Sequence, residues 1–364
     1  MATGATRLAD VIVPEIFDPY MQNITEEKTA IINSGAVVND SAISAHLAGG
    51  GLTFNTPSWR DLANDDEDIM TDDYDDQYGH PTFGVSAPYA GTLGNSIPKK
   101  TGSLMEVSVR MMRHQSWTSV ELAGVLAGSD PQESIAQRVG AYWARRRQAA
   151  FVALMKGVFA DNAAAPVGSE HVQNDLTFDA SGSIFQAGLT DFNAVNFLRA
   201  CLTMGDSQND LGMVLMHSIV YHKAQVNNLI DFRPDATNPD AEDVPFFLGR
   251  RVIVDDGMPT TDGKVFETWL FGAGAVRFGT GPVSLPSETE RHARAGAGAG
   301  QDVLHTRVCW CFHPVGHKYN GTAPNGGPSN AATANNLAHA DSWQRVFPER
   351  KQIKIARLIT RESA

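Results

Sequence analysis

One stretch constrains the fold more than any other: residues Ser129 to Asp161 carry the pattern of a single long helix. Asp130 can cap it, Pro131 occupies the first helical position, where a missing N–H costs nothing, and Glu133 follows in the first turn. No proline interrupts the next thirty or so residues, and a helix of that length measures about 45 Å. Apolar residues recur mostly three or four positions apart, at Ile135, Val139, Tyr142, Trp143, Phe151, Leu154, Met155, Val158 and Phe159. The pattern predicts a long amphipathic helix, most simply the core helix of a large soluble α+β domain, with something extended lying across it.

The composition indicates a folded protein with a sizeable core. The chain has 364 residues, of which 42% are hydrophobic and 19% charged, so we expect two domains or one domain with large excursions. Three cysteines are too few for a disulfide framework, and the absence of a signal peptide fits a reducing cytoplasm. No apolar run approaches the roughly eighteen residues of a membrane span. The net charge of -12 argues against a dedicated nucleic-acid binder, but not against a protein that encloses nucleic acid.

A long polar excursion separates two strand-like segments, Leu52–Thr56 and Ser103–Met112. Loops of about fifty residues without a core of their own are usually functional or covered by a partner. The excursion is strongly acidic from Asp61 to Asp76. A calcium loop of the EF-hand type needs a glycine at its sixth position, which the sequence Asp72-Asp73-Tyr74-Asp75-Asp76-Gln77 lacks. We therefore favour an acidic loop that faces solvent or a partner over an ion site.

The rest of the chain alternates short helices and strands between turns. The order strand, helix, strand, strand after residue 212 indicates a compact sheet-and-helix domain. Residues 320 to 336 are rich in glycine, asparagine and alanine and are expected to form a surface loop. The predicted helices are Thr25–Asn33, Thr190–Gly205 and Ser218–Ile230; the predicted strands are Met213–His217, Phe246–Asp256, Glu267–Val276, Val303–Val315 and Gln352–Ile359.

One predicted strand carries several potential metal ligands on a single face. Zinc could use them, but alternate residues on a strand diverge too little to surround one tetrahedral ion. Small buried cysteines and polar histidines at a sheet edge are the simpler interpretation. These residues are His305, Cys309, Cys311 and His313, with His317 just beyond the strand.

The sequence offers no recognisable catalytic motif. It lacks a Walker A sequence, H-E-x-x-H, G-x-S-x-G and paired C-x-x-C motifs. Gly296–Gly300 has the spacing G-x-G-x-G, but a strand follows it instead of a helix, so we interpret it as a hinge or loop tip. His114, His217 and His222 are expected to be structural or exposed. We predict no catalytic residue, no metal ligand and no cofactor site.

Taken in order, these elements resemble the major capsid proteins of tailed bacteriophages with the Hong Kong 97-type fold. Met213–Ser218, Leu248–Pro259 and Leu270–Ala275 resemble the axial-domain strands of that family. Ser342–Val346 together with Gln352–Ile359 resembles its closing strand, and the opening Val11–Tyr20 is similar to the arms of one subgroup. The resemblance covers nearly the whole chain.

The resemblance implies an α+β fold and a part for every segment. It implies an N-terminal arm over residues 1–48, an extended two-stranded loop over 49–115, a peripheral domain over 116–205 with the spine helix at 130–161, an axial domain over 206–300, and return strands to the peripheral domain over 301–364. Many relatives carry a cleaved scaffolding region before the arm. Since this chain starts at the arm, we expect no such cleavage.

The function that the resemblance implies is structural. Copies of the chain would self-assemble into the hexamers and pentamers of an icosahedral phage head that encloses double-stranded DNA, in the cytoplasm of the bacterial host. Portal, separate scaffolding or decoration proteins are the further partners implied, without a membrane, a cofactor or catalysis. An encapsulin-type compartment shell, which shares the fold, is the nearest alternative. A tail or adaptor protein of the virion and a cytoplasmic metal-dependent enzyme are the others.

Charge indicates which residues could join neighbouring subunits. We expect the acidic excursion of one subunit to meet a basic surface on the next, supplied by consecutive arginines of the long helix or by two lysines near the end of the excursion. The residues of this prediction are Asp65, Asp66, Asp68, Asp72 and Asp73 on the acidic side, and Lys99, Lys100, Arg145, Arg146 and Arg147 on the basic side.

Overall fold

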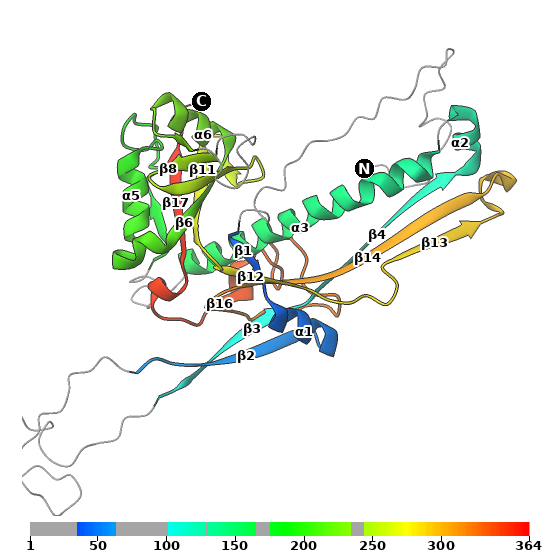
Figure 1. The fold of residues 1–364 in the computed structure, drawn as a ribbon, viewed down its shortest axis with the longest axis horizontal. Coiled ribbons are helices and arrows are strands. Elements are labelled where there is room, and N and C mark those ends of the chain that lie inside the picture. Colours follow the sequence, from blue (N-terminus) through cyan, green and yellow to red (C-terminus); the bar gives the residue numbers. More distant parts are fainter. Residues whose placement is uncertain (1–34, 63–100, 129, 165–174, 234–243, 364) are drawn as a thin grey trace, which may run out of the picture. The chain divides into compact units, whose positions relative to one another are not determined.

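A computed structural model describes residues 35–62, 101–128, 130–164, 175–233 and 244–363 of the chain. Its longest described element is helix α3 (Pro131–Ala164), which follows the short helix α2 (Glu121–Ala127) and confirms the predicted long helix (Figure 1). The helix begins as predicted, because the Asp130 carboxylate accepts a hydrogen bond from the Gln132 N–H at 2.9 Å.

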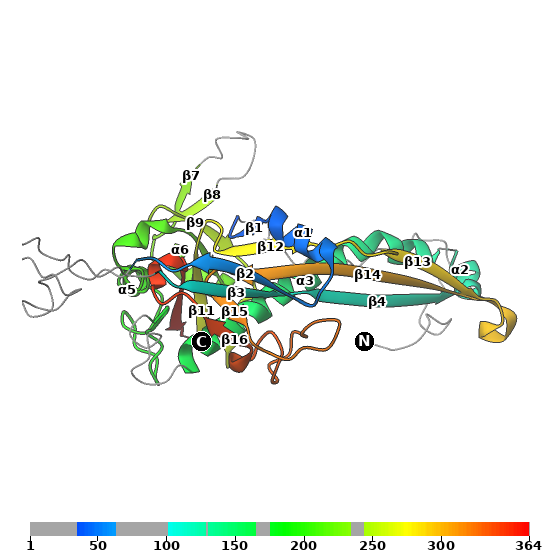
Figure 2. The ribbon, with the colours of Figure 1, turned by 90° about the horizontal axis from the view of Figure 1, so that it is seen from below.

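The two halves of α3 lie in different surroundings. The first half runs partly exposed along β4 (Met111–Val120) and β14 (Gln301–Pro314), as Figure 2 shows. From Gln148 to Phe159 nearly every residue is buried, and Lys156 is exposed. The prediction of an amphipathic helix is therefore wrong for the second half, because the core surrounds it on almost every side.

The first sheet is built around the long strand β14. Its order is β1-β12-β14-β13, and β4 also pairs with β14; the three partners of β14 all run antiparallel to it. Helix α1 (Ser41–Gly49) follows β1 and packs against β12. The further strands are β1 (Val37–Asn39), β12 (Val276–Thr280) and β13 (Ser287–His292).

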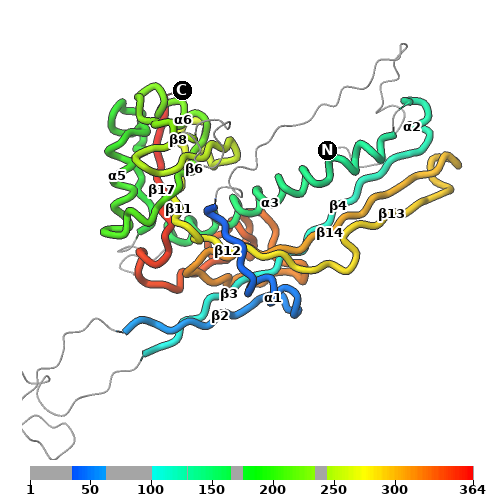
Figure 3. Tube along the Cα trace, viewed as in Figure 1, coloured from blue at the N-terminus to red at the C-terminus, as the bar shows by residue number. Residues whose placement is uncertain are grey.

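The second sheet has eight strands, and its central strands are buried on both faces. Met213 and Leu215 of β6 join the core around α3, whereas Val214 and Met216 join the core beneath α5 (Ala194–Leu202) and α6 (Ser218–Val226). The last strand, β17, returns to this sheet from the far end of the sequence (Figure 3). The order is β5 (Thr177–Asp179), β17 (Ile355–Arg361), β11 (Val265–Gly272), β6 (Leu211–Met216), β9 (Arg250–Val254), β8 (Val244–Phe247) and β7 (Asp231–Arg233), with β10 (Thr260–Thr261) paired to β11.

A third sheet has the order β16 (Trp343–Arg345), β15 (His317–Tyr319), β3 (Ser103–Val109) and β2 (Thr53–Trp59). Strands β2 and β3 confirm that a strand lies on each side of the excursion. The predicted strand Ser103–Met112 is too long, because β3 ends at Val109 and Met111 begins β4 of the first sheet. Residues 56–105 form a unit separate from the rest of the chain.

Alternation along β3 predicts one apolar face with Met105, Val107 and Val109. This prediction is wrong in part, because Met105 is exposed and Glu106 is buried. Glu106 can be buried because its carboxylate accepts a hydrogen bond from the Gly316 N–H.

Several predicted element boundaries are wrong. Phe246–Asp256 is two strands, because Leu248 and Gly249 take positive φ angles of 47° and 79° and form a tight hairpin turn between β8 and β9. Glu267–Val276 is likewise interrupted, since β11 ends at Gly272 and β12 begins in another sheet. The closing strand begins at Ile355, after a short 3₁₀ turn.

The helix boundaries shift for local reasons. Helix α5 begins at Ala194 because the Asn193 side chain accepts from the Asn196 N–H, whereas Thr190 bonds the backbone of Gln186 instead of capping. Helix α6 begins at Ser218 but ends at Val226, and its cap is His217. The predicted helix Thr25–Asn33 lies outside the described residues.

We predict that Gly157→Ala destabilises the fold, whereas Gly140→Ala in the same helix does not. A Cβ at position 157 would lie 2.0 Å from the Leu337 carbonyl oxygen and 2.7 Å from the Trp343 ring, and nothing lies within 4 Å of one at position 140. The first change should cost about 1–3 kcal/mol through overpacking. The second should gain up to about 1 kcal/mol from helix propensity. Thermal unfolding of the two variants measures both, and equal effects would contradict this packing.

Candidate inter-subunit surfaces

The three consecutive arginines of α3 do not share one surface. Successive helical residues are about 100° apart, so Arg145 and Arg147 lie on opposite sides of the helix. Arg145 and Arg146 line a cleft together with Lys156, whereas Arg147 lines a separate groove. We call the first the Arg146–Lys156 cleft and the second the Arg147 groove.

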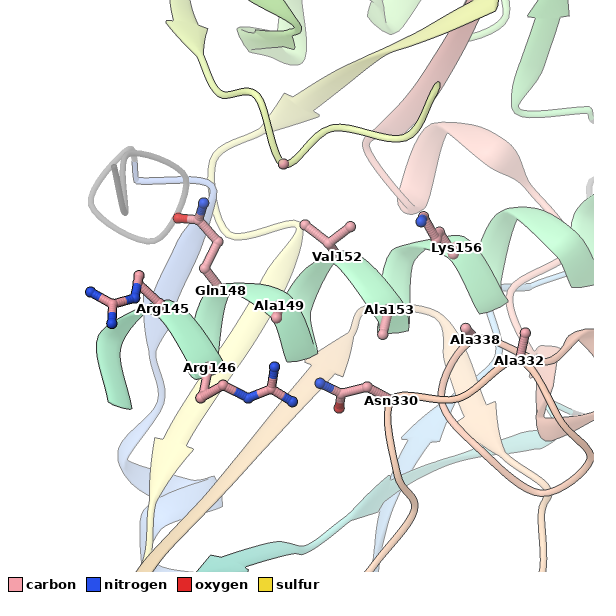
Figure 4. A pocket seen from close by; sticks show the side chains of 11 residues that line it. Arg145, Arg146, Gln148, Ala149, Val152, Ala153, Lys156, Asn330, Ala332 and Ala338 are labelled. Atoms are coloured by element: carbon pink, nitrogen blue, oxygen red, sulfur yellow. The ribbon is translucent and has the colours of Figure 1, made fainter. Parts of the chain in front are cut away.

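The Arg146–Lys156 cleft has a volume of about 430 Å³ and three walls, from α3, from the turn at Gly257 and from the segment 330–338. Figure 4 shows Arg146 and Asn330 pointing toward one another across it, with Arg145 pointing away from them. Small apolar side chains form its floor, namely Ala149, Val152, Ala153, Ala332 and Ala338. The remaining lining residue, Gln148, donates a hydrogen bond to the buried Asp255.

The cleft is positively charged. No described residue that lines it is an aspartate or a glutamate, and within the described residues no ion pair joins Arg146 or Lys156 to a carboxylate. Behind it, Arg113 donates to the Pro328 carbonyl and fixes the loop against β4. Burial, together with the positive charge of Arg146, lowers the pKa of Arg113. Like charges therefore gather here in a chain whose net charge is -12.

The Arg147 groove lies on the other side of α3 and is mostly apolar. The Arg147 guanidinium lies 5.6 Å from the centre of the Phe278 ring, and Arg307, which also lines the groove, pairs with Glu288 at 3.1 Å. Trp143 and Trp310 contribute further aromatic surface. Arg147 is thus held by an aromatic ring, away from the other two arginines.

The acidic side of the predicted contact lies outside the described residues, as do Lys99 and Lys100. The pairing of Asp65, Asp66, Asp68, Asp72 and Asp73 with any basic group therefore stays a prediction. Lys156 and Arg113 are not among the residues predicted from the sequence. Lys156 could have been found, because residues eleven positions apart on a helix, such as 145 and 156, share a face.

Comparison with known proteins decides the family. No protein-family model matches the chain. Over 352 residues, which are 95% of this chain and 95% of the relative, the sequence is 34% identical to the major capsid protein of Bacillus phage SPP1. The chain belongs to the phage major capsid proteins.

Solved structures agree with this assignment in fold. The cyanophage Pam1 capsid asymmetric unit matches with a TM-score of 0.54 and 11% identity, covering 99% of each chain. The capsid of Ralstonia phage GP4 matches with a TM-score of 0.54 and 10% identity, covering 100% of this chain and 99% of the other. The capsid protein therefore has the predicted α+β, Hong Kong 97-type fold, and its place is the phage head. The compartment-shell and enzyme alternatives find no support in these comparisons.

The potential metal ligands of β14 have different partners in the capsid protein and do not form one site. His305 lies 3.3 Å from Glu290, whereas His313 is buried 3.6 Å from Glu106. Cys309 and Cys311 are buried, and burial raises the pKa of the Cys311 thiol to about 12. Among the described residues, no group of three or more His, Cys, Asp or Glu side chains could hold a metal ion. No described helix is long and apolar enough to span a membrane.

Asp161 is a charge near the far end of α3 that weakens the fold. Burial raises its pKa to about 6, against the attraction of Arg345 and with the help of repulsion from Asp341. The folded chain thus holds this proton more tightly than the unfolded chain, whose carboxyl titrates near 3.8. The contribution of Asp161 to stability is consequently most favourable with the carboxyl protonated, and it falls as the pH rises from about 4 to 6.

We predict that Asp161→Asn raises the unfolding temperature at about pH 7.5 and leaves it unchanged near pH 3.5. The amide can keep the hydrogen bond from the Arg345 backbone but carries no buried charge. The gain at neutral pH should be about 1–3 kcal/mol, from 1.36 kcal/mol per pKa unit. Thermal unfolding at both pH values measures it, and a variant less stable than the parent at pH 7.5 would contradict the assignment.

Proposed function

We propose that this capsid protein self-assembles into the hexamers and pentamers of an icosahedral head that encloses double-stranded DNA. The observation that carries the proposal is the 34% identity to a phage major capsid protein along 95% of both chains. A role confined to structure, without catalysis, fits the absence of a recognisable catalytic motif. Assembly would take place in the cytoplasm of the bacterial host, with portal, separate scaffolding or decoration proteins as further partners.

The described surface supports association with neighbours. Large apolar side chains lie exposed in groups, and such groups usually mark interaction sites. On α2 these are Leu122, Val125 and Leu126, and on α5 they are Val195, Leu198 and Leu202. A subunit covered on several sides by other subunits would bury them.

We also propose the division of the chain that the resemblance implies. Residues 1–48 form the arm, 49–115 the extended loop, 116–205 the peripheral domain, 206–300 the axial domain and 301–364 the return strands. Residues 301–305 of β14 pair with residues 116–120 of β4, which supports a return of the last segment to the peripheral domain. Strand β17 of the same segment instead joins the eight-stranded sheet beside β11 of the axial segment.

The direct test is negative-stain electron microscopy, with light scattering, of the chain produced alone and then with its neighbouring phage genes. Closed shells tens of nanometres across are the expected result. Shells with nucleic acid would assign a viral head, and shells filled with a protein cargo would assign a compartment. A monodisperse small oligomer under every condition would contradict the proposal.

For the contacts between subunits, we propose that the acidic excursion of one copy meets the basic groups of another. Changing Arg145, Arg146 and Arg147 together to glutamate should abolish shells, because those of the three that face the excursion would then repel it. The chain should remain soluble, since these side chains are at least partly exposed. Sedimentation and microscopy measure the yield, and normal shells would refute the pairing.

A further inference from the structure

The Arg146–Lys156 cleft combines donors of hydrogen bonds with an apolar floor. Arg146 and Lys156 stand near its two ends on α3, and the amide of Asn330 faces Arg146 (Figure 4). The floor between them consists of alanine and valine side chains. An occupant of matching chemistry carries carboxylates at its two ends and apolar side chains between them.

The spacing of the two cations fits a short extended peptide. Arg146 and Lys156 are ten residues apart on one helix, which is about 15 Å along its axis. An extended chain advances about 3.3 Å per residue, so four or five residues cover that distance. Two carboxylates four or five positions apart could therefore reach both cations at once.

The acidic excursion contains one such sequence. Asp68 is followed by Ile69, Met70 and Thr71 and then by Asp72 and Asp73, so two apolar side chains lie between carboxylates at the required spacing. No lysine or arginine occurs between Asp61 and Pro98. The charge and the apolar content of this stretch both complement the cleft.

We propose that the Arg146–Lys156 cleft binds residues 68–73 of a second copy of this chain. Asp68 pairs with the cation at one end and Asp72 with the cation at the other. Met70, which lies on the same face of an extended chain as these two carboxylates, covers the alanine and valine floor. The inference rests on the proposed shell assembly and narrows the basic side of the contact to Arg146 and Lys156, with Arg147 excluded because it lies in the other groove.

Nucleic acid is a poorer occupant of this cleft. Phosphates lie on the outside of a duplex and bring no apolar group to cover the alanine and valine side chains. A concave cleft of about 430 Å³ also admits a single peptide strand more readily than a double helix. Contact between this cleft and packaged DNA is therefore the alternative that the experiment below separates. In that case the cleft variant would form shells at normal yield.

The test exchanges charges across the contact in the full-length chain. The cleft variant carries Arg146→Glu and Lys156→Glu, and the loop variant carries Asp68→Lys, Asp72→Lys and Asp73→Lys. Each alone should lower the yield of shells at least about tenfold, because the facing charges become alike. Both sets combined in one chain should restore the yield to within about threefold of the parent, since opposite charges again face each other.

Co-expression of the two separate variants decides whether the segment comes from a second copy. Each variant's loop then matches the other's cleft, so oligomers that contain both chains should reappear. Hexamers can alternate the two chains, whereas a ring of five keeps one mismatched contact. Recovery in the combined chain but not in the mixture would overturn the second-copy assignment, because it would place the segment in its own chain's cleft.

Arg147→Glu is the matched control, being the same change on the same helix but outside the cleft, and it should form shells like the parent. A tenfold loss in that control would overturn the assignment to this cleft. Normal yields of shells from the cleft variant, with or without DNA inside, would also overturn the assignment, as would failure of the combined chain while parent and control assemble.

If the parent itself forms no shells, the proposed function has failed, which is a separate result. Unfolding temperatures of the variants, whose two altered cleft side chains are exposed, verify that the fold persists.

Discussion

The described fold depends on the close packing of other segments of the chain against α3. At Gly157 the Leu337 carbonyl and the Trp343 ring lie where any side chain would be, and the Trp343 indole N–H donates to that carbonyl at 2.8 Å. This contact closes the core on the side of the helix that a long loop covers. Because the same half of α3 also packs on the inner face of the eight-stranded sheet, one helix ties the two sheets and the loop into a single core.

The core around α3 uses only one half of that helix, which leaves other surfaces of the chain available for neighbours. In the isolated chain the first half of α3 is partly exposed, and the outer faces of α2 and α5 and the strand β13 are exposed. A monomeric enzyme would gain nothing from such surface, whereas a subunit of a shell uses it. Charges are also grouped: Arg145, Arg146 and Lys156 line one cleft, and nine carboxylates lie between Asp61 and Asp76 of the excursion.

The sequence predicted what local rules determine. The cap at Asp130, the proline after it and the uninterrupted pattern were enough to place α3, and alternation was enough to place β14. Prediction failed where residues far away in the sequence determine the local structure. Glu106 is buried because residues 313 and 316 supply its partners, and the turn at Leu248 requires a left-handed backbone at a residue that seldom adopts it. The three arginines were predicted to supply one basic surface, but their division between two surfaces follows from helical geometry and from the segments that pack on either side of α3.

The most direct measurement is a cryo-electron microscopy map of the assembled shell. It should show closed icosahedral symmetry, α3 enclosed by its own chain from Gln148 onward, and density for residues 68–73 of a neighbouring subunit along the floor between Arg146 and Lys156. A shell in which this cleft faces solvent, or holds a segment without carboxylates, would contradict the account of how one subunit binds the next.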